Sequence, residues 1–213
     1  MPCSPESHAT QEANMKSIIV RAALGAMLFT AITTTSQAQV IPDTRGIHLG
    51  AAINATSIKL DETEFSDDER ENGYGANIYA GYNFTKNLGL LLSLTGANIN
   101  DSQTENFSVA HIDLMGRASF PGRSALVPYL ELGIAGVGAE YDSDGGEVEL
   151  SGTGVGLGAG VNFFFTRKVA LDLGFRYTMG EFGTAKINDR EVDSGDGVGF
   201  NTTRINLGLA FYP

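Results

Sequence analysis

The chain has 213 residues, of which 42% are hydrophobic, with 27 Gly, no Trp and a formal net charge of −11. This length is enough for one domain with a sizeable core. The acidic balance argues against a nucleic-acid partner, because phosphate contacts need clustered Lys and Arg. It does not argue against a membrane, since the charges can lie outside the bilayer.

The first clear pattern begins at Met15. Two basic residues precede an apolar run over 22–32, and the small-residue sequence SQA follows it. This order is typical of a secretory signal peptide and predicts cleavage after Ala38. The apolar run is shorter than the roughly 20 residues of a membrane-spanning helix. Residues before Met15 match no part of a signal, so Met1 and Met15 both stay open as the start.

Cys3 is the only cysteine, and it precedes the predicted cleavage site. A chain beginning at Gln39 would therefore have no disulfide, no thiol nucleophile and no cysteine-ligated metal. We also expect no cofactor.

From Gln39 onward, apolar residues recur with a period of two. Eight segments of about the length of a membrane-spanning strand follow this pattern. In chain order they are 45–54, 73–84, 88–98, 107–120, 127–141, 150–165, 168–180 and 199–212. The sixth contains "GTGVGLGAGVNFFF", in which glycine occupies every second position. That spacing differs from the G-x-G-x-x-G of a phosphate-binding loop and predicts a strand with one nearly empty face.

The connections between these segments alternate between short and long. The short ones, "TKN", "PGRSA" and "TR", contain tight-turn residues. The long ones are "ATSIKLDETEFSDDEREN", "NDSQTEN", "DSDGGEVE" and "EFGTAKINDREVDSGDGVG". In outer-membrane barrels short turns face the periplasm and long loops face outward, so Asp67 and Asp193 should lie outside the cell.

The predicted fold class is therefore all-β, an eight-stranded antiparallel up-and-down transmembrane β-barrel. We expect residues 1–38 to be an N-terminal extension and cleavable signal peptide, and residues 39–213 to form the barrel domain. Aromatic residues near the strand ends predict interfacial girdles. They are Tyr82, Phe84, Phe120, Tyr129, Phe163, Phe164, Phe165, Phe211 and Tyr212.

The face opposite the apolar residues should line the lumen, since it mixes Gly, Tyr and Asn with scattered charges instead of dense Lys and Glu. Six luminal residues are expected to form a structural ion network: Asp113, Arg117, Glu131, Asp172, Arg176 and Arg204. Their charges balance, which suits a closed lumen because an unpaired buried ion costs several kcal/mol. Counted from the turn "PGRSA", Arg117 and Glu131 should lie opposite each other. Glycines on the sixth segment would leave room for the long arginines in so narrow a barrel.

With this architecture, residues 39–213 resemble the small outer-membrane β-barrels of Gram-negative bacteria, the OmpA/OmpX-like or "porin family" proteins. The closing stretch "RINLGLAFYP" is similar to the signal that the barrel-assembly machinery recognises. The resemblance implies a monomer in the outer membrane, in contact with outer-membrane lipids and lipopolysaccharide and assembled by that machinery.

Three functions stay open. The first is a non-enzymatic structural or interaction protein with acidic extracellular loops, and the charge-paired lumen favours it. The second is a narrow porin-like channel for small solutes. The third is a lipid-modifying enzyme, in which His111 and Asp113 could act as a base and its orienter. Ser108 falls on the opposite face, however, and His48 has no acidic neighbour in its strand.

The acidic loops "DETEFSDDERE" and "DSDGGE" offer carboxylates of the kind that bind Ca²⁺. Neither has the spacing of an EF-hand loop. Because runs of like charge usually stay solvated, we interpret both acidic segments as solvated loops and predict no metal site. The ligand of these loops stays unidentified.

Overall fold

The computed structural model describes residues 42–61, 71–99, 107–143, 146–187 and 190–213. Side chains are described for these residues except 60–61, 107, 141–148 and 185–197. The predicted signal peptide, the boundary after Ala38 and the outward position of Asp67 lie outside this part of the chain. So do the side chain of Asp193, most of the first acidic cluster and the side chains of the second.

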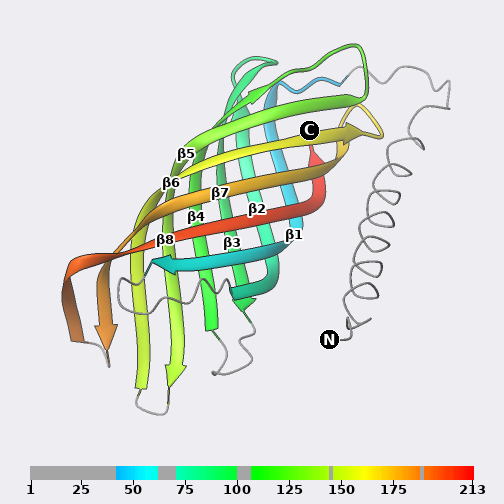
Figure 1. Ribbon diagram of the computed structural model, residues 1–213. Coiled ribbons are helices and arrows are strands. Elements are labelled where there is room, and N and C mark those ends of the chain that lie inside the picture. Colours follow the sequence, from blue (N-terminus) through cyan, green and yellow to red (C-terminus); the bar gives the residue numbers. More distant parts are fainter. Residues whose placement is uncertain (1–41, 62–70, 100–106, 144–145, 188–189) are drawn as a thin grey trace, which may run out of the picture. The chain divides into compact units, whose positions relative to one another are not determined.

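Eight antiparallel strands form one closed barrel in the order β1 to β8 (Figure 1). The strands are β1 Gly46–Asp61, β2 Glu71–Asn83, β3 Leu88–Ile99, β4 Phe107–Ser119, β5 Leu126–Ser143, β6 Gly146–Phe164, β7 Val169–Ile187 and β8 Arg190–Phe211. Each strand pairs with the next in sequence, and β8 pairs with β1 to close the barrel. The predicted fold class is confirmed.

The described ranges include no helix that is long and apolar enough to cross a membrane.

Strand β3 illustrates how the sequence pattern produces this fold. Along it, every second residue is buried, from Gly89 to Ile99. Its four outward leucines are exposed, whereas Ser93 and Thr95 face the lumen and are buried. The other strands likewise carry large apolar side chains on the outside, and β4, β5, β7 and β8 carry charged side chains within. A soluble barrel has the reverse arrangement, so the outer wall is suited to lipid.

The β5–β6 and β7–β8 hairpins extend further than the sequence predicted, and β1 continues to Asp61 instead of ending at residue 54. β5 and β6 reach Ser143 and Gly146, and β7 and β8 reach Ile187 and Arg190. The prediction of long loops at "DSDGGEVE" and "EFGTAKINDREVDSGDGVG" was therefore wrong. The predicted strands ended where the apolar alternation ended, but antiparallel hydrogen bonding continues without an apolar face once the hairpin leaves the bilayer.

The register of the β7–β8 pair shifts between Phe182 and Thr184. A β-bulge bends the strand that carries it. Figure 1 shows β7 and β8 bending sharply toward their hairpin end.

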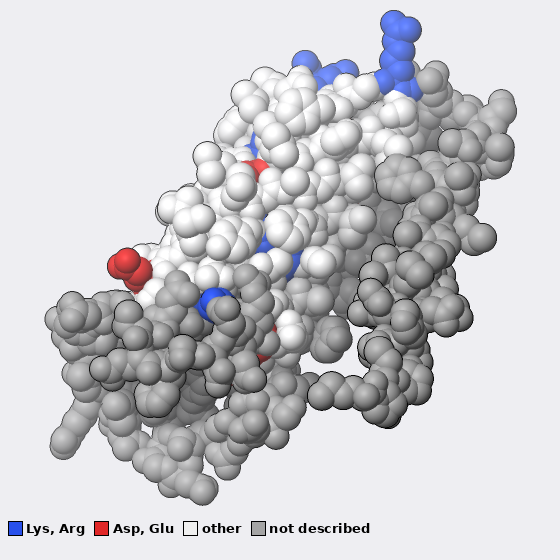
Figure 2. Space-filling model, viewed as in Figure 1, with Lys and Arg blue, Asp and Glu red and all other residues white. Residues whose placement is uncertain are grey.

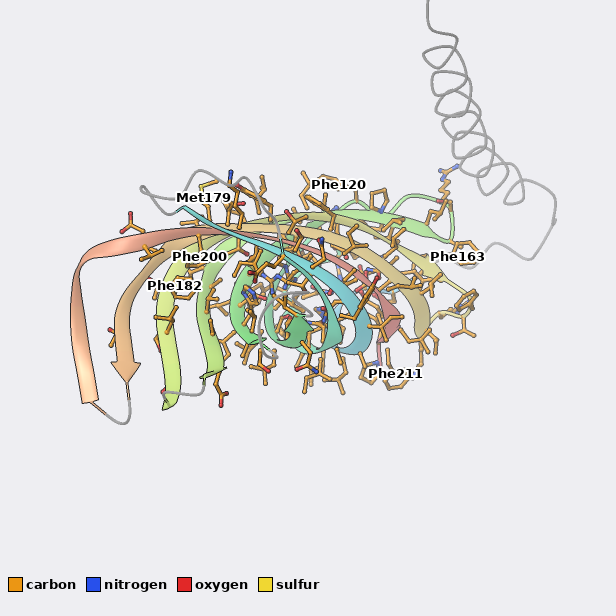
Figure 3. The ribbon with its side chains drawn as sticks, turned by 60° about the horizontal axis from the view of Figure 1, so that its bottom comes forward. Phe120, Phe163, Met179, Phe182, Phe200 and Phe211 are labelled. Atoms are coloured by element: carbon orange, nitrogen blue, oxygen red, sulfur yellow. The ribbon has the colours of Figure 1, made fainter. Side chains whose placement is uncertain are left out.

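The lumen is filled by two apolar clusters with a polar layer between them. The cluster near the short turns consists of Tyr79, Leu91, Met115, Val127, Phe164, Ala170, Ala210 and Tyr212. The cluster near the long loops consists of Ile58, Ile99, Val109, Ala135, Val137, Ala139, Phe182 and Phe200. Within the second cluster, the ring centroids of Phe182 and Phe200, labelled in Figure 3, are 4.6 Å apart.

Three of the aromatics predicted for the interfacial girdles lie inside the barrel instead. Tyr129, Phe164 and Tyr212 are buried in the lumen. They were assigned by residue type and nearness to a strand end, whereas the pleat decides the side on which each residue points. Phe120 and Phe211 are exposed as predicted, and Figure 3 shows them on opposite sides of the barrel.

Candidate functional site: the buried ion network

The centre of the lumen holds a chain of alternating charges. At one end, Arg117 on β4 lies directly opposite Glu131 on β5 in the strand register. Its Nη2 is 2.7 Å from Glu131 Oε1, and its Nε donates to the same oxygen at 2.8 Å. Both side chains are 3% exposed, so the pair is withdrawn from water. The guanidinium also lies over the ring of Tyr129, with 4.0 Å from Cζ to the centroid, which suits a cation–π contact.

Arg176 on β7 joins this pair to a second one across the lumen. Its Nη2 donates to Glu131 Oε2 at 2.7 Å, and its Nη1 donates to Asp113 Oδ2 at 2.8 Å. Arg204 on β8 completes the chain with a bidentate contact, since Nη1 and Nη2 donate to the two oxygens of Asp113 at 2.8 Å each. Bidentate arginine–carboxylate pairs are among the strongest side-chain hydrogen bonds.

Asp172 belongs to a separate part of the lumen. No ion pair within 4.0 Å joins it to an arginine among the described residues. It accepts hydrogen bonds from Tyr79 Oη at 2.6 Å and Tyr129 Oη at 2.7 Å. The two tyrosines therefore satisfy a buried carboxylate that the sequence analysis had placed in the ion network.

The glycine face of β6 makes room for these side chains. A Cβ built on Gly160 would overlap the phenol of Tyr129, and one on Gly158 would lie 3.0 Å from Glu131 Oε2. Residues without a side chain are therefore required on this wall where Tyr129 and Glu131 cross the lumen. The glycines of "GTGVGLGAGV" were predicted to make room for the arginines, but the side chains that they accommodate are Tyr129 and Glu131.

Little space is left among the charged residues of the lumen. The hollow among Arg117, Tyr129, Glu131, Asp172 and Arg176 measures about 10 Å³. A single water molecule needs about 10 to 15 Å³ by this measure. Larger hollows, of about 910 and 760 Å³, are lined by outward-facing side chains such as Ile112 and Ile134, so they lie on the outer wall.

The groups considered for catalysis are not arranged as a catalytic set. His111 lies inside the barrel, but neither of its ring nitrogens has a hydrogen-bond partner among the described residues. The carboxylate of Asp113 is occupied by Arg176 and Arg204. Ser108 is exposed on the outer face, where its hydroxyl donates to Asn98. His48 stacks on Tyr212, with ring centroids 5.3 Å apart.

Within the described part of the chain, no cluster of three or more His, Cys, Asp or Glu could hold a metal ion. The three luminal arginines are bound to Glu131 and Asp113, and the carboxylate of Asp172 is bound by two tyrosines.

Sequence reasoning missed the neutral groups that complete the network. Ser93, Thr95 and Thr178 accept hydrogen bonds from the arginines, and the two tyrosines donate to Asp172. Alternation alone could have placed all of them in the lumen, because each lies on the face opposite the outward apolar residues of its own strand. It could not show which charge each would reach across the barrel.

Comparison with known families decides what kind of barrel this is. Residues 23–211 match the family model described as "Outer membrane protein beta-barrel domain". The chain belongs to this family. As a member of the outer-membrane β-barrel family, it is a protein of the outer membrane. A curated relative, the 22 kDa outer membrane protein of Rhizobium leguminosarum bv. viciae, is 24% identical over 159 residues, which are 70% of this chain and 71% of the relative.

Solved structures of outer-membrane proteins share the fold. Neisserial surface protein A (NspA) matches with a TM-score of 0.61 and 20% identity, over 78% of this chain and 96% of that one. OprG from Pseudomonas aeruginosa matches with a TM-score of 0.52 and 14% identity, over 81% and 98%. Ail, the attachment invasion locus protein of Yersinia pestis, matches with a TM-score of 0.50 and 19% identity, over 79% and 100%. At these identities the likeness concerns the fold alone.

Proposed function

We propose that this protein is a non-enzymatic, closed barrel that serves as a rigid support for acidic loops at the cell surface. The observation that carries the proposal is the filled lumen, where five alternating charges and two apolar clusters occupy the cross-section. A pore needs a continuous aqueous path, and the hollow of about 10 Å³ among the charged residues is too small for one. The proposed form is a monomer that contacts outer-membrane lipids and lipopolysaccharide after insertion by the barrel-assembly machinery.

Liposome swelling tests the proposal against a channel for small solutes. Vesicles carrying the refolded protein should swell in arabinose or glycine no faster than protein-free vesicles, while vesicles with a general porin swell quickly. Protein-dependent swelling would support the channel instead.

Lipid analysis tests the proposal against an enzyme. Mass spectra of outer-membrane lipids should be the same from cells with and without the protein. A lipid species that appears with the protein and disappears in a His111→Ala variant would contradict the non-enzymatic role.

A further inference from the structure

Basic residues and outward-facing phenylalanines occur together at the short-turn end of the barrel. The combinations are Phe84 with Lys86, Phe120 with Arg123, Phe165 with Arg167 and Lys168, and Phe211 with Arg45. They belong to the β2–β3, β4–β5 and β6–β7 turns and to the place where β8 meets β1. Because consecutive strands are neighbours in the closed barrel, these four places recur at every second strand around the rim.

Two of the turns have the same structure as well as a similar sequence. The segments are "YNFTKNL", 82–88, and "FFFTRKV", 163–169. In each, the threonine N–H donates to the carbonyl three residues later, at 3.2 Å for Thr85 and 3.3 Å for Thr166. The threonine hydroxyl accepts from the N–H groups two and three residues later. The distances are 3.1 and 3.0 Å in the first turn and 3.2 and 3.0 Å in the second.

The aromatic pair before each of these threonines is also repeated. The ring centroids of Tyr82 and Phe84 are 5.4 Å apart, and those of Phe163 and Phe165 are 5.2 Å apart, both edge to face. The two turns are separated by four strands in the barrel order, so they lie on opposite sides of the rim. Each presents a fixed aromatic pair followed by a basic side chain.

Hydrogen bonds also hold neighbouring turns together. The contacts are Thr44 Oγ1 to Lys86 O at 3.0 Å, Asn87 Nδ2 to Ser119 O at 2.9 Å, Phe164 N to Ala125 O at 2.8 Å and Tyr212 N to Lys168 O at 2.7 Å. The basic residues are therefore carried on one continuous, hydrogen-bonded rim and not on separate flexible loops.

The charge of this rim is almost entirely positive. It has five exposed basic side chains, Arg45, Lys86, Arg123, Arg167 and Lys168, and one exposed acidic side chain, Asp43. None of the five basic groups takes part in an ion pair within 4.0 Å in the described part of the chain. Figure 2 shows basic side chains projecting from the upper end, where the short turns lie in Figure 1. At the opposite end, Glu140 and Glu181 are exposed.

We propose that this rim binds the headgroups of anionic phospholipids in the periplasmic leaflet. The short turns of outer-membrane barrels face the periplasm, and their girdle aromatics lie at the membrane interface. A basic side chain two or three residues beyond such a phenylalanine is at the right depth to meet lipid phosphates. Attraction to an anionic surface corresponds to roughly a fivefold preference per Lys or Arg.

A single fluorophore can test this directly, because the chain has no tryptophan. The variant Phe165→Trp is refolded into two series of vesicles made of phosphatidylcholine and phosphatidylglycerol. Phosphatidylcholine is brominated in one series and phosphatidylglycerol in the other, and the mole fraction of brominated lipid is the same in both. Comparing the two quenching curves gives the local enrichment of phosphatidylglycerol at position 165. We expect an enrichment of at least about fivefold at low salt, which is the preference given by one basic side chain. In 1 M salt the enrichment should disappear, since the screening length falls to about 3 Å.

Two matched variants separate charge from simple interfacial position. Adding Arg167→Gln and Lys168→Gln to Phe165→Trp should remove most of the enrichment. Met179→Trp, on an outward-facing residue toward the long-loop end, should report no enrichment. Slower migration of each variant on SDS gels after boiling verifies that it is folded. Equal quenching by both lipids at position 165, or enrichment that persists in the glutamine variant, would overturn the proposal.

Discussion

Arg117 and Glu131 occupy facing positions on β4 and β5, and their side chains meet 2.7 Å apart with 3% of each exposed. Glu131 is also held by Arg176, so the carboxylate lies between two guanidinium groups. This makes Glu131 the link between the hairpin and the far wall of the barrel. Its loss should therefore affect the barrel more than the loss of Arg117.

The first prediction concerns this difference. Removing one partner of a buried pair typically costs about 3 to 5 kcal/mol, because the other charge is left uncompensated. In urea unfolding followed by circular dichroism, Glu131→Ala should lose more stability than Arg117→Ala. The double variant should lose clearly less than the sum of the two. As a control, Arg123→Ala and Glu140→Ala, at opposite ends, should have small effects that add. Additive losses for Arg117 and Glu131 would mean that the two side chains do not interact.

The second prediction concerns the glycine face of β6. A side chain at Gly160 would meet the phenol of Tyr129 and would lie 2.5 Å from the carbonyl oxygen of Leu173. Gly160→Val should therefore lower the free energy of unfolding by about 1 to 3 kcal/mol or prevent refolding. Gly96→Val is the matched control, because nothing lies within 4 Å of a Cβ at Gly96. If the two variants are equally stable in urea, β6 does not depend on its empty face.

The third prediction concerns the carboxylate of Asp172. Tyr79→Phe or Tyr129→Phe removes one of its two hydrogen bonds without changing the shape of the ring. Each change should cost about 1 to 3 kcal/mol in the unfolding free energy, since a buried acceptor loses its donor. Tyr74→Phe is the control, because Tyr74 is exposed on the outer wall. Similar midpoints for all three variants would show that Asp172 is satisfied in another way.

Much of this arrangement could be predicted from the sequence. Because side chains alternate along a strand, the apolar residues that face lipid also identify the residues between them as luminal. The turn "PGRSA" added the register, which is why Arg117 could be placed opposite Glu131. Contacts across the lumen depend on the curvature of the whole barrel, so the two-oxygen contact of Arg204 with Asp113 and the tyrosines on Asp172 could not be derived from strand pairing. The outer ends of β1 and of β5 to β8 were missed because water, unlike lipid, imposes no apolar pattern on a strand.

The fourth prediction concerns orientation. With Cys3 before the predicted cleavage site, the processed chain has no cysteine, so an introduced thiol is unique. Cysteine at position 67 or 181 should react with an impermeant maleimide on whole cells, because acidic long-loop ends are expected to face outward. Lys86→Cys should react only after the outer membrane is permeabilised. Labelling of intact cells at position 86 alone would reverse the topology and place the basic rim outside.

The most direct test of a closed barrel is conductance in planar lipid bilayers. The refolded protein, added at picomolar concentration in 1 M KCl, should give no current steps above the protein-free baseline. The reason is that paired side chains occupy the lumen, namely those of Asp113, Arg117, Glu131, Arg176 and Arg204. Faster migration of the unheated than of the boiled protein on SDS gels, recovered from the same preparation, verifies that folded barrels are present. Reproducible single-channel steps from the unmodified protein would contradict the closed lumen and favour a pore.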